Sequence, residues 1–277
     1  MIRISNMTET DIPFAKSLTD IEGWGYRDSD FRRLIALGPD RCFVAWKGRD
    51  PTGTVTTTLH GDYAFIGTLI VKHDAREEGI GRALMEKAID RLFQKGATTI
   101  ELDAVISVVP MYRKLSFEDK YLSLRLRRAG GGIAPGKRVK MEPPRAREII
   151  DFDRKMIGMD RGKLIRRYLD EFGASFHVLS GRGVRGYAVV KERAGGVLMI
   201  GPFVADGLET AKRLLGQLLE RYHGRVLTIG LPAVNVRANS MFLEAGFVNS
   251  EPSLRMYLGK RMSYEGHMYG IASPEKG

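Results

Sequence analysis

The segment at residues 69–84 has the residue types and spacing of a site for a phosphorylated ligand. It reads Leu-Ile-Val-Lys-His-Asp-Ala-Arg-Glu-Glu-Gly-Ile-Gly-Arg-Ala-Leu, an apolar run that passes through two glycines into a helical pattern. Glycines permit a sharp turn and a close approach of a ligand to the backbone. The start of a helix presents unpaired N–H groups and a partial positive charge. With Arg76 five residues before Gly81, the segment predicts an anion site suited to a pyrophosphate.

Two well-known phosphate loops do not fit this segment. No Gly-Lys-Ser/Thr follows the glycines, and Leu84 stands where a Gly-x-Gly-x-x-Gly dinucleotide loop needs its third glycine. A glycine pair before a helix is also compatible with simple helix entry and packing. The five histidines show no metal-ligand spacing, and the single Cys42 excludes a multi-cysteine zinc site, so we predict no metal.

The elements that must position this loop predict an α/β protein. Apolar residues that recur every three to four positions indicate helices, and clusters of β-branched and aromatic residues indicate strands. In the first half, strands are predicted at 2–5, 41–46, 53–60, 63–72, 98–104 and 122–126, and helices at 8–20, 28–37, 80–94 and 109–115. In the predicted strand at 122–126, leucines alternate with Ser123, Arg125 and Arg127, which predicts that one face of the strand is exposed to solvent.

The second half repeats the same order of elements. Helices are predicted at 144–157, 160–172, 208–222 and 237–245, and strands at 174–179, 185–192, 197–204, 226–231 and 254–258. Between the halves, residues 127–144 are rich in glycine and proline and poor in large apolar residues, as is typical of a linker. We therefore predict a first domain at 1–128, a linker at 129–143 and a second domain at 144–277.

Composition and charge restrict the class of protein. The chain has 277 residues, of which 43% are hydrophobic and 28% charged, as in ordinary globular proteins. It contains no apolar run of about 18 residues and begins without a secretory signal pattern, so we expect a cytoplasmic protein without a membrane partner. Residues 1–130 contain 20 basic and 18 acidic residues, whereas residues 131–277 contain 24 basic and 15 acidic residues. The basic second half either attracts polyanions or is a solvated surface. Nucleic acid is not an expected partner, because aromatic residues do not interleave with the basic ones.

Three consecutive motifs of the first half resemble the GNAT superfamily of N-acetyltransferases. Arg76-x-x-Gly79-x-Gly81, after a strand ending at Val71, resembles the acetyl-CoA pyrophosphate loop of that superfamily. Leu102-Asp103-Ala104 and Met111-Tyr112-Arg113-Lys114-Leu115-Ser116-Phe117 are similar to its next strand and to its short helix, which typically ends Tyr-x-x-x-Gly-Phe. Ser116 replaces the usual glycine, and Val105 stands where an asparagine is often found.

The resemblance implies transfer of an acetyl group from acetyl-CoA to a primary amine that attacks directly. In such enzymes the fourth and fifth strands splay apart, and the pantetheine arm lies between them. The arm would be bound by backbone groups of Leu69, Ile70 and Val71, one of whose amides would polarise the acetyl carbonyl. The pyrophosphate would be held by amides of Glu77, Glu78, Gly79, Ile80, Gly81 and Arg82. We expect a small-molecule or peptide amine as the acceptor.

The resemblance also implies roles for individual side chains. Tyr112 would protonate the departing thiolate, or else it is a core aromatic. An alkyl ammonium has a pKa of about 10.4, so the reaction needs a proton acceptor: Glu22, Asp30, Asp103 or a water chain. We single out Asp103, at the end of the strand beside the site, although it would serve equally to cap the next turn. Trp24 lies in the early loop that often walls the acceptor pocket, or it packs as an ordinary tryptophan.

The second half resembles a degenerate copy of the first. Residues 235–247 carry the pattern Asn-x-x-Ala-x-x-x-Tyr-x-x-x-Gly-Phe, with Phe242 in place of the tyrosine. The loop at 200–211 is about four residues shorter and places Asp206 and Glu209 opposite Arg76 and Gly79. Two carboxylates would repel a pyrophosphate.

We infer two tandem GNAT-like domains, each a mixed, mostly antiparallel sheet flanked by helices, of which the second has lost CoA binding. The tail from Met268 to Pro274 either closes over an active site or forms a last strand. Two other functions are compatible with the sequence: an acetyl-CoA-binding sensor or scaffold without turnover, and a polyanion-binding protein that uses the basic second half.

Overall fold

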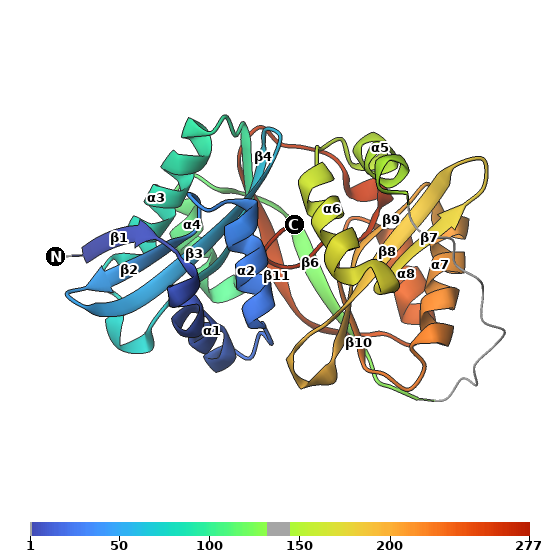
Figure 1. Ribbon diagram of the computed structural model, residues 1–277, viewed down its shortest axis with the longest axis horizontal. Coiled ribbons are helices and arrows are strands. Elements are labelled where there is room, and N and C mark those ends of the chain that lie inside the picture. Colours follow the sequence, from blue (N-terminus) through green and yellow to red (C-terminus); the bar gives the residue numbers. More distant parts are fainter. Residues whose placement is uncertain (1, 132–144) are drawn as a thin grey trace.

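The computed structural model describes residues 2–131 and 145–277, which form two halves that lie side by side (Figure 1). The first half contains β1 (Ile2–Asn6), α1 (Ile12–Ile21), α2 (Asp28–Leu37), β2 (Phe43–Lys47), β3 (Asp50–His60), β4 (Tyr63–Val71), α3 (Ile80–Gln94), β5 (Thr99–Ala104), α4 (Val109–Arg113) and β6 (Glu118–Arg128). The second half contains α5 (Ala146–Ile157), α6 (Gly162–Phe172), β7 (Phe176–Ser180), β8 (Val184–Glu192), β9 (Leu198–Ala205), α7 (Leu208–Arg221), β10 (Leu227–Pro232), α8 (Val236–Glu244), β11 (Val248–Gly259) and β12 (Met268–Gly270). The predicted order of elements is confirmed. Most of the predicted linker, residues 132–143, lies outside the described residues.

The strands of both halves form one continuous sheet. Its order is β1-β2-β3-β4-β5-β11-β6-β10-β9-β8-β7, with β12 paired to β9. Among the strands of the described residues, only the pairs β4–β5 and β9–β10 are parallel, so the predicted mostly antiparallel arrangement is confirmed.

The two halves exchange their last long strands. β11 of the second half lies between β5 and β6, and β6 of the first half lies between β11 and β10. An unpaired sheet edge exposes N–H and C=O groups, and this exchange pairs both strands on both sides. The predicted domains therefore share their sheet, although each has its own helices.

Separate apolar clusters fill the two faces of the sheet. On one face of the first half, α3 and α4 pack on Ala64 and Ile66 of β4. Tyr63 and Phe65 of the same strand face the other way, into a cluster with α5 and α6 of the second half. Because side chains alternate along a strand, β4 joins the core of its own half to the junction between the halves.

The predicted exposed face of β6 is confirmed only at its end, where Arg127 is exposed and Leu126 is buried. Ser123 is fully buried and Arg125 is mostly buried, whereas Leu122 is 44% exposed. Ser123 and Arg125 are covered because both donate to Asp103 of β5, at 3.2 and 2.9 Å. Alternation therefore located the strand but did not show that Ser123 and Arg125 are covered.

Candidate active site

β4 and β5 separate halfway along their length. They pair only from Tyr63–Thr99 to Ile66–Leu102. From Gly67 to Val71, no described strand pairs with this edge of β4. The divergence coincides with a bulge, because the register with β3 shifts between Ile70–Thr54 and Gly67–Thr56.

Thr68 forms this bulge in an unusual backbone conformation. Its φ is 43°, which β-branched residues rarely adopt. Such strain persists only where the surroundings hold it. Thr68 is buried, and its hydroxyl lies 2.8 Å from that of Thr56 on β3. The sequence predicted Leu69, Ile70 and Val71 as the strand that binds a ligand arm, and the structure places all three beside this opening.

The loop between β4 and α3 spans eight residues. A sharp turn before α3 and the contacts of Arg76 define its course. Glu77 and Gly79 have φ values of 68° and 80°, so the chain turns sharply before α3 begins at Ile80. Arg76 donates through Nε to the Val71 carbonyl at 3.1 Å and through Nη2 to Glu22 at 2.8 Å. Arg76 therefore holds the loop against the end of β4, and the negative charge of Glu22 offsets part of its positive charge.

The loop presents a row of backbone donors. Within the described residues, the N–H groups of Glu77, Glu78, Gly79, Ile80, Gly81 and Arg82 have no hydrogen-bond partner. No heavy atom lies within 4 Å of a Cβ built on Gly79, so the row is accessible at its centre. Six consecutive donors at a helix start match the acceptors of a pyrophosphate. This geometry fits the coenzyme A phosphates that the sequence resemblance implies.

Tyr112 lies on α4, which follows β5. Its ring packs edge-on against Phe117, with 6.0 Å between the centroids. Ser116 has a φ of 65°, the conformation for which related sequences use glycine, and lets the Phe117 N–H reach the Tyr112 carbonyl at 3.1 Å. Burial raises the pKa of Tyr112 well above its usual range, so its hydroxyl is protonated at neutral pH. No described residue hydrogen-bonds this hydroxyl.

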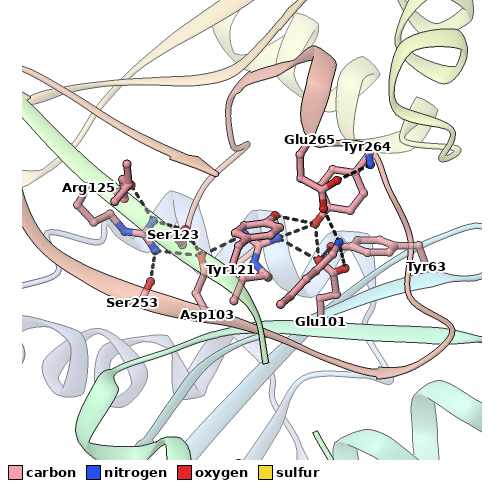
Figure 2. Close-up of polar contacts among 12 residues, drawn as sticks. Tyr63, Glu101, Asp103, Tyr121, Ser123, Arg125, Ser253, Tyr264 and Glu265 are labelled. Atoms are coloured by element: carbon pink, nitrogen blue, oxygen red, sulfur yellow. Dashed lines mark hydrogen bonds and ion pairs between the residues drawn. The ribbon is translucent and has the colours of Figure 1, made fainter. Parts of the chain in front are cut away.

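Asp103 occupies a buried ion-pair cluster (Figure 2). Its carboxylate accepts from Arg255 at 2.6 and 3.1 Å and from Arg125 at 2.9 Å. Burial alone would raise the pKa of Asp103, but these two guanidinium groups outweigh burial and lower it to about 2. A carboxylate held this firmly in its ionised form is a weak proton acceptor. The predicted base role of Asp103 does not fit this environment, and we assign it to joining β5, β6 and β11.

The other two carboxylate candidates are also ion-paired. Glu22 binds Arg76, as described above. Asp30 accepts from Arg33 at 2.9 Å and lies 3.3 Å from Arg193. Burial would raise the pKa of Asp30, but the charges of Lys276 and Arg193 outweigh burial and lower it. None of the three candidates therefore has an uncommitted carboxylate.

A second buried cluster adjoins Asp103 and was not anticipated from the sequence. Glu101, fully buried on β5, accepts from Tyr63 at 2.9 Å and from Lys120 at 2.6 Å, and it also binds Tyr264 and Arg255 (Figure 2). Lys120 also reaches Glu265 at 2.8 Å. These contacts connect β5 to segments about 160 residues later in the chain, so no local pattern could have revealed them.

Replacing Arg255 by methionine is expected to destabilise the fold by at least about 3 kcal/mol, because Asp103 and Glu101 would lose a buried partner. The measurement is urea unfolding followed by circular dichroism. Arg261→Met is the matched control, since Arg261 is exposed and its guanidinium lies over the Tyr257 ring, 6.0 Å from the centroid. Equal stability of the two variants would contradict a structural role for the cluster.

In the second half, the chain itself fills the equivalent opening. β9 and β10 pair in parallel only from Leu198–Leu227 to Ile200–Ile229. Beyond that point β12 pairs with β9, and the Ile271 N–H donates to the Gly230 carbonyl at 2.8 Å. The first part of the tail, Met268–Gly270, is thus a last strand, whereas residues 272–274 belong to a turn at the end of the chain.

Asn235, the asparagine that this half retains, supports the inserted strand. Its Nδ2 donates to the carbonyls of Met268 and Glu265, each at 3.0 Å, and its Oδ1 caps α8. Only two residues separate β9 from α7, so this loop is shorter than expected. Asp206 binds Arg185 at 2.7 Å. The two-residue loop therefore lacks the length of the loop from Lys72 to Gly79, and it carries a carboxylate.

Trp24 lies in the loop between α1 and α2. It is partly buried and packs against Tyr26, with 6.3 Å between the ring centroids. Tyr26 is 2% exposed and points to the junction between the halves, where its hydroxyl donates to Glu275 at 2.6 Å. The segment Gly-Trp-Gly-Tyr thus contributes an aromatic side chain to the junction between the halves, but that side chain is Tyr26 and not Trp24.

Family comparisons agree with this geometry. Residues 12–117 match the acetyltransferase (GNAT) family and residues 149–270 match the acetyltransferase (GNAT) domain. The chain is 28% identical over 118 residues to the N-alpha-acetyltransferase MAK3 of Arabidopsis thaliana, a match that covers 39% of this chain and 62% of that protein. Within the described residues, no helix is long and apolar enough to cross a membrane.

Solved structures share the fold over nearly the whole chain. A putative acetyltransferase from Pyrococcus horikoshii superimposes with a TM-score of 0.84 at 24% identity, over 100% of this chain and 96% of that one. A tandem GNAT protein from the clavulanic acid biosynthesis pathway gives 0.61 at 14% identity, over 95% and 100%. Both halves thus match the same family, and the chain belongs to the GNAT acetyltransferases, a family of acyl-transferring enzymes, as a tandem of two family domains.

Proposed function

We propose that the first half transfers an acetyl group from acetyl-CoA to a primary amine. The observation that carries this proposal is the combination of two features: the opening between β4 and β5, and the six unpaired amides from Glu77 to Arg82. In this proposal the amides hold the pyrophosphate, and the edge of β4 at Leu69, Ile70 and Val71 binds the pantetheine arm. Acetyl-CoA supplies the activated acetyl thioester.

The side chains suggest how protons move during the transfer. The Tyr112 hydroxyl, which is protonated at neutral pH, donates its proton to the departing thiolate. The amine must lose a proton as it attacks. Because Glu22, Asp30 and Asp103 are each committed to arginine, we assign this step to water and not to a carboxylate. Backbone N–H groups beside the bulge at Thr68 stabilise negative charge on the acetyl oxygen.

The second half has a supporting role in this proposal. Its opening is filled by β12, and its loop before α7 has only two residues, one of which is the carboxylate Asp206. It also lends β11 to the sheet beside β5, which holds one wall of the proposed site.

Isothermal titration of the full chain with acetyl-CoA is expected to show one site per chain. Mass spectrometry of mixtures with small amines and with peptides that have a free α-amine would then detect acetylated products; the relative named N-alpha-acetyltransferase motivates the peptides. Two equivalent binding sites would contradict the assigned role of β12. Absence of binding would contradict the proposed function as a whole.

A further inference from the structure

The chain beyond β12 crosses from the second half to the first. After Ile271, residues 272–277 form a turn in which the Ser273 carbonyl accepts the N–H groups of Lys276 at 3.0 Å and Gly277 at 3.1 Å. The Ala272 N–H closes the turn on the Gly277 carbonyl at 2.7 Å. Figure 1 shows this end of the chain at the junction between the halves, close to α2 and α6. We call residues 272–277 the tail turn.

The tail turn lies directly against β4. A Cβ built on Gly67 would be 2.6 Å from the Cα of Glu275, a distance that real Cβ atoms essentially never show. A Cβ on Gly277 would lie 3.0 Å from the hydroxyl of Tyr63 and from the ring of Phe65. The tail turn therefore covers the face of β4 that carries Tyr63, Phe65 and Gly67. Only glycine at position 67 permits this contact without displacement.

This face is the approach route for an acceptor in the proposed reaction. The bulge at Thr68 follows Gly67 directly, and the opposite face of β4 is filled by the α3 core through Ala64 and Ile66. An amine that reaches the bulge must come from the face that the tail turn covers. The tail turn therefore occupies space that an acceptor needs.

Glu275 is the centre of the polar contacts made by the tail turn. It is 1% exposed, accepts from the Tyr26 hydroxyl at 2.6 Å and pairs with Lys276. The Arg193 guanidinium lies over the Tyr26 ring at 4.2 Å. Burial alone would raise the pKa of Glu275, but the positive charges of Lys276 and Arg193 outweigh burial and hold it well below its usual range. The first half provides Tyr26, and the second half provides Arg193.

A third buried donor faces the tail turn. Lys191 of β8 is 4% exposed and donates to the Ala272 carbonyl at 2.5 Å and to the Tyr168 hydroxyl at 3.2 Å. No carboxylate among the described residues forms an ion pair with Lys191. Without the tail turn, Lys191 would lose its carbonyl partner and Tyr26 its carboxylate partner, whereas Arg193 would keep its ion pair with Asp30 beside the vacated space. Buried donors without partners are costly, so a ligand with a carboxylate would bind favourably here.

We propose that Tyr26, Lys191 and Arg193 form a carboxylate subsite on the acceptor side of the first half. Glu275 fills this subsite in the resting chain, and the acceptor is an amine that also carries a carboxylate and displaces the tail turn. The identity of the acceptor rests on the proposed function, whereas the subsite is testable by binding alone.

The binding test uses glutarate as the probe and the full chain with Glu275→Gln, titrated by calorimetry without acetyl-CoA. Glutamine keeps the shape of the side chain and removes its charge. We expect the variant to bind glutarate at least tenfold more tightly than the wild type, in which the charged Glu275 competes with glutarate for the subsite. Glutaramide, the uncharged diamide analogue of glutarate, is expected not to bind. Adding Arg193→Gln to Glu275→Gln should weaken glutarate binding at least tenfold. If this double variant does not fold, Tyr26→Phe is combined with Glu275→Gln in place of Arg193→Gln. Equal binding by wild type and variant, or no effect of the second substitution, would overturn the subsite.

The activity test compares ω-amino acids of three to six carbons with their amides. We expect kcat/KM to be at least tenfold higher for the carboxylate member of the best pair. Arg193→Gln should remove this preference without changing the affinity for acetyl-CoA. If the chain acetylates amines without preferring carboxylates over amides and does not bind glutarate, the subsite is overturned, but the proposed acetyl transfer is not. Specific glutarate binding in a chain that acetylates no amine would support the subsite and contradict the proposed function.

Discussion

Replacing Tyr112 by phenylalanine is expected to lower kcat about 100- to 10,000-fold, the usual contribution of a positioned general acid. The thiolate that leaves the acetyl group is stabilised by the proton it receives, and the Tyr112 hydroxyl is the donor that we assign to it. Phenylalanine retains the edge-on packing against Phe117, so the ring keeps its contacts and only the hydroxyl is lost. Steady-state kinetics with saturating acetyl-CoA measure the change.

Two comparisons separate loss of the acid from loss of the fold. Calorimetry should show that Tyr112→Phe binds acetyl-CoA as the wild type does, because the hydroxyl is remote from the phosphate loop in our assignment. Tyr222→Phe removes a hydroxyl in the second half, where its partner is His177 at 2.9 Å, and is expected to leave kcat within about twofold. If Tyr112→Phe retained the wild-type kcat, another group would have to protonate the thiolate.

The parts of this molecule that follow local rules were predictable from the sequence. The loop from Arg76 to Gly81 and the helix after it depend on glycine placement and a four-residue apolar repeat, both contained within 20 residues. The loss of the loop in the second half was visible for the same reason. Asn235 was also recognised, but its partners were not, since it holds Met268 and Glu265 some 30 residues away.

The parts that depend on distant pairing could not be predicted. Alternation identified β6 as a strand, but which strands flank it depends on β10 and β11, more than 100 residues later. The same exchange determines the role of Asp103. A carboxylate at the end of a strand suggested a base, whereas Arg255 arrives from β11 and holds it ionised. The tail turn brings Glu275 next to Tyr26 across 249 positions, a proximity that no spacing in the sequence indicates.

The second large effect is expected from Gly79→Glu, which copies the residue that the second half places there, Glu209. Gly79 caps α3 at the centre of the row of unpaired amides. A carboxylate about 4 Å from a phosphate charge costs about 1–4 kcal/mol per charge pair, and a pyrophosphate carries at least two charges. We therefore expect the affinity for acetyl-CoA to fall about 1,000-fold or more, measured by calorimetry at low ionic strength so that salt does not screen the repulsion.

The chain offers a matched control for backbone strain at the other end of the same helix. Gly96 follows α3 with a φ of 88°, close to the 80° of Gly79, and neither glycine has an atom within 4 Å of a built Cβ. Gly96→Glu therefore imposes the same strain and the same charge far from the loop, and its affinity for acetyl-CoA should change less than about threefold. Gly79→Ala adds the strain at the loop without the charge and should lie between the two. If both glutamate variants lost binding equally, strain in α3 would explain the result. If Gly79→Glu bound acetyl-CoA normally, the phosphates could not lie on this loop, and the opening between β4 and β5 would lose its assigned ligand.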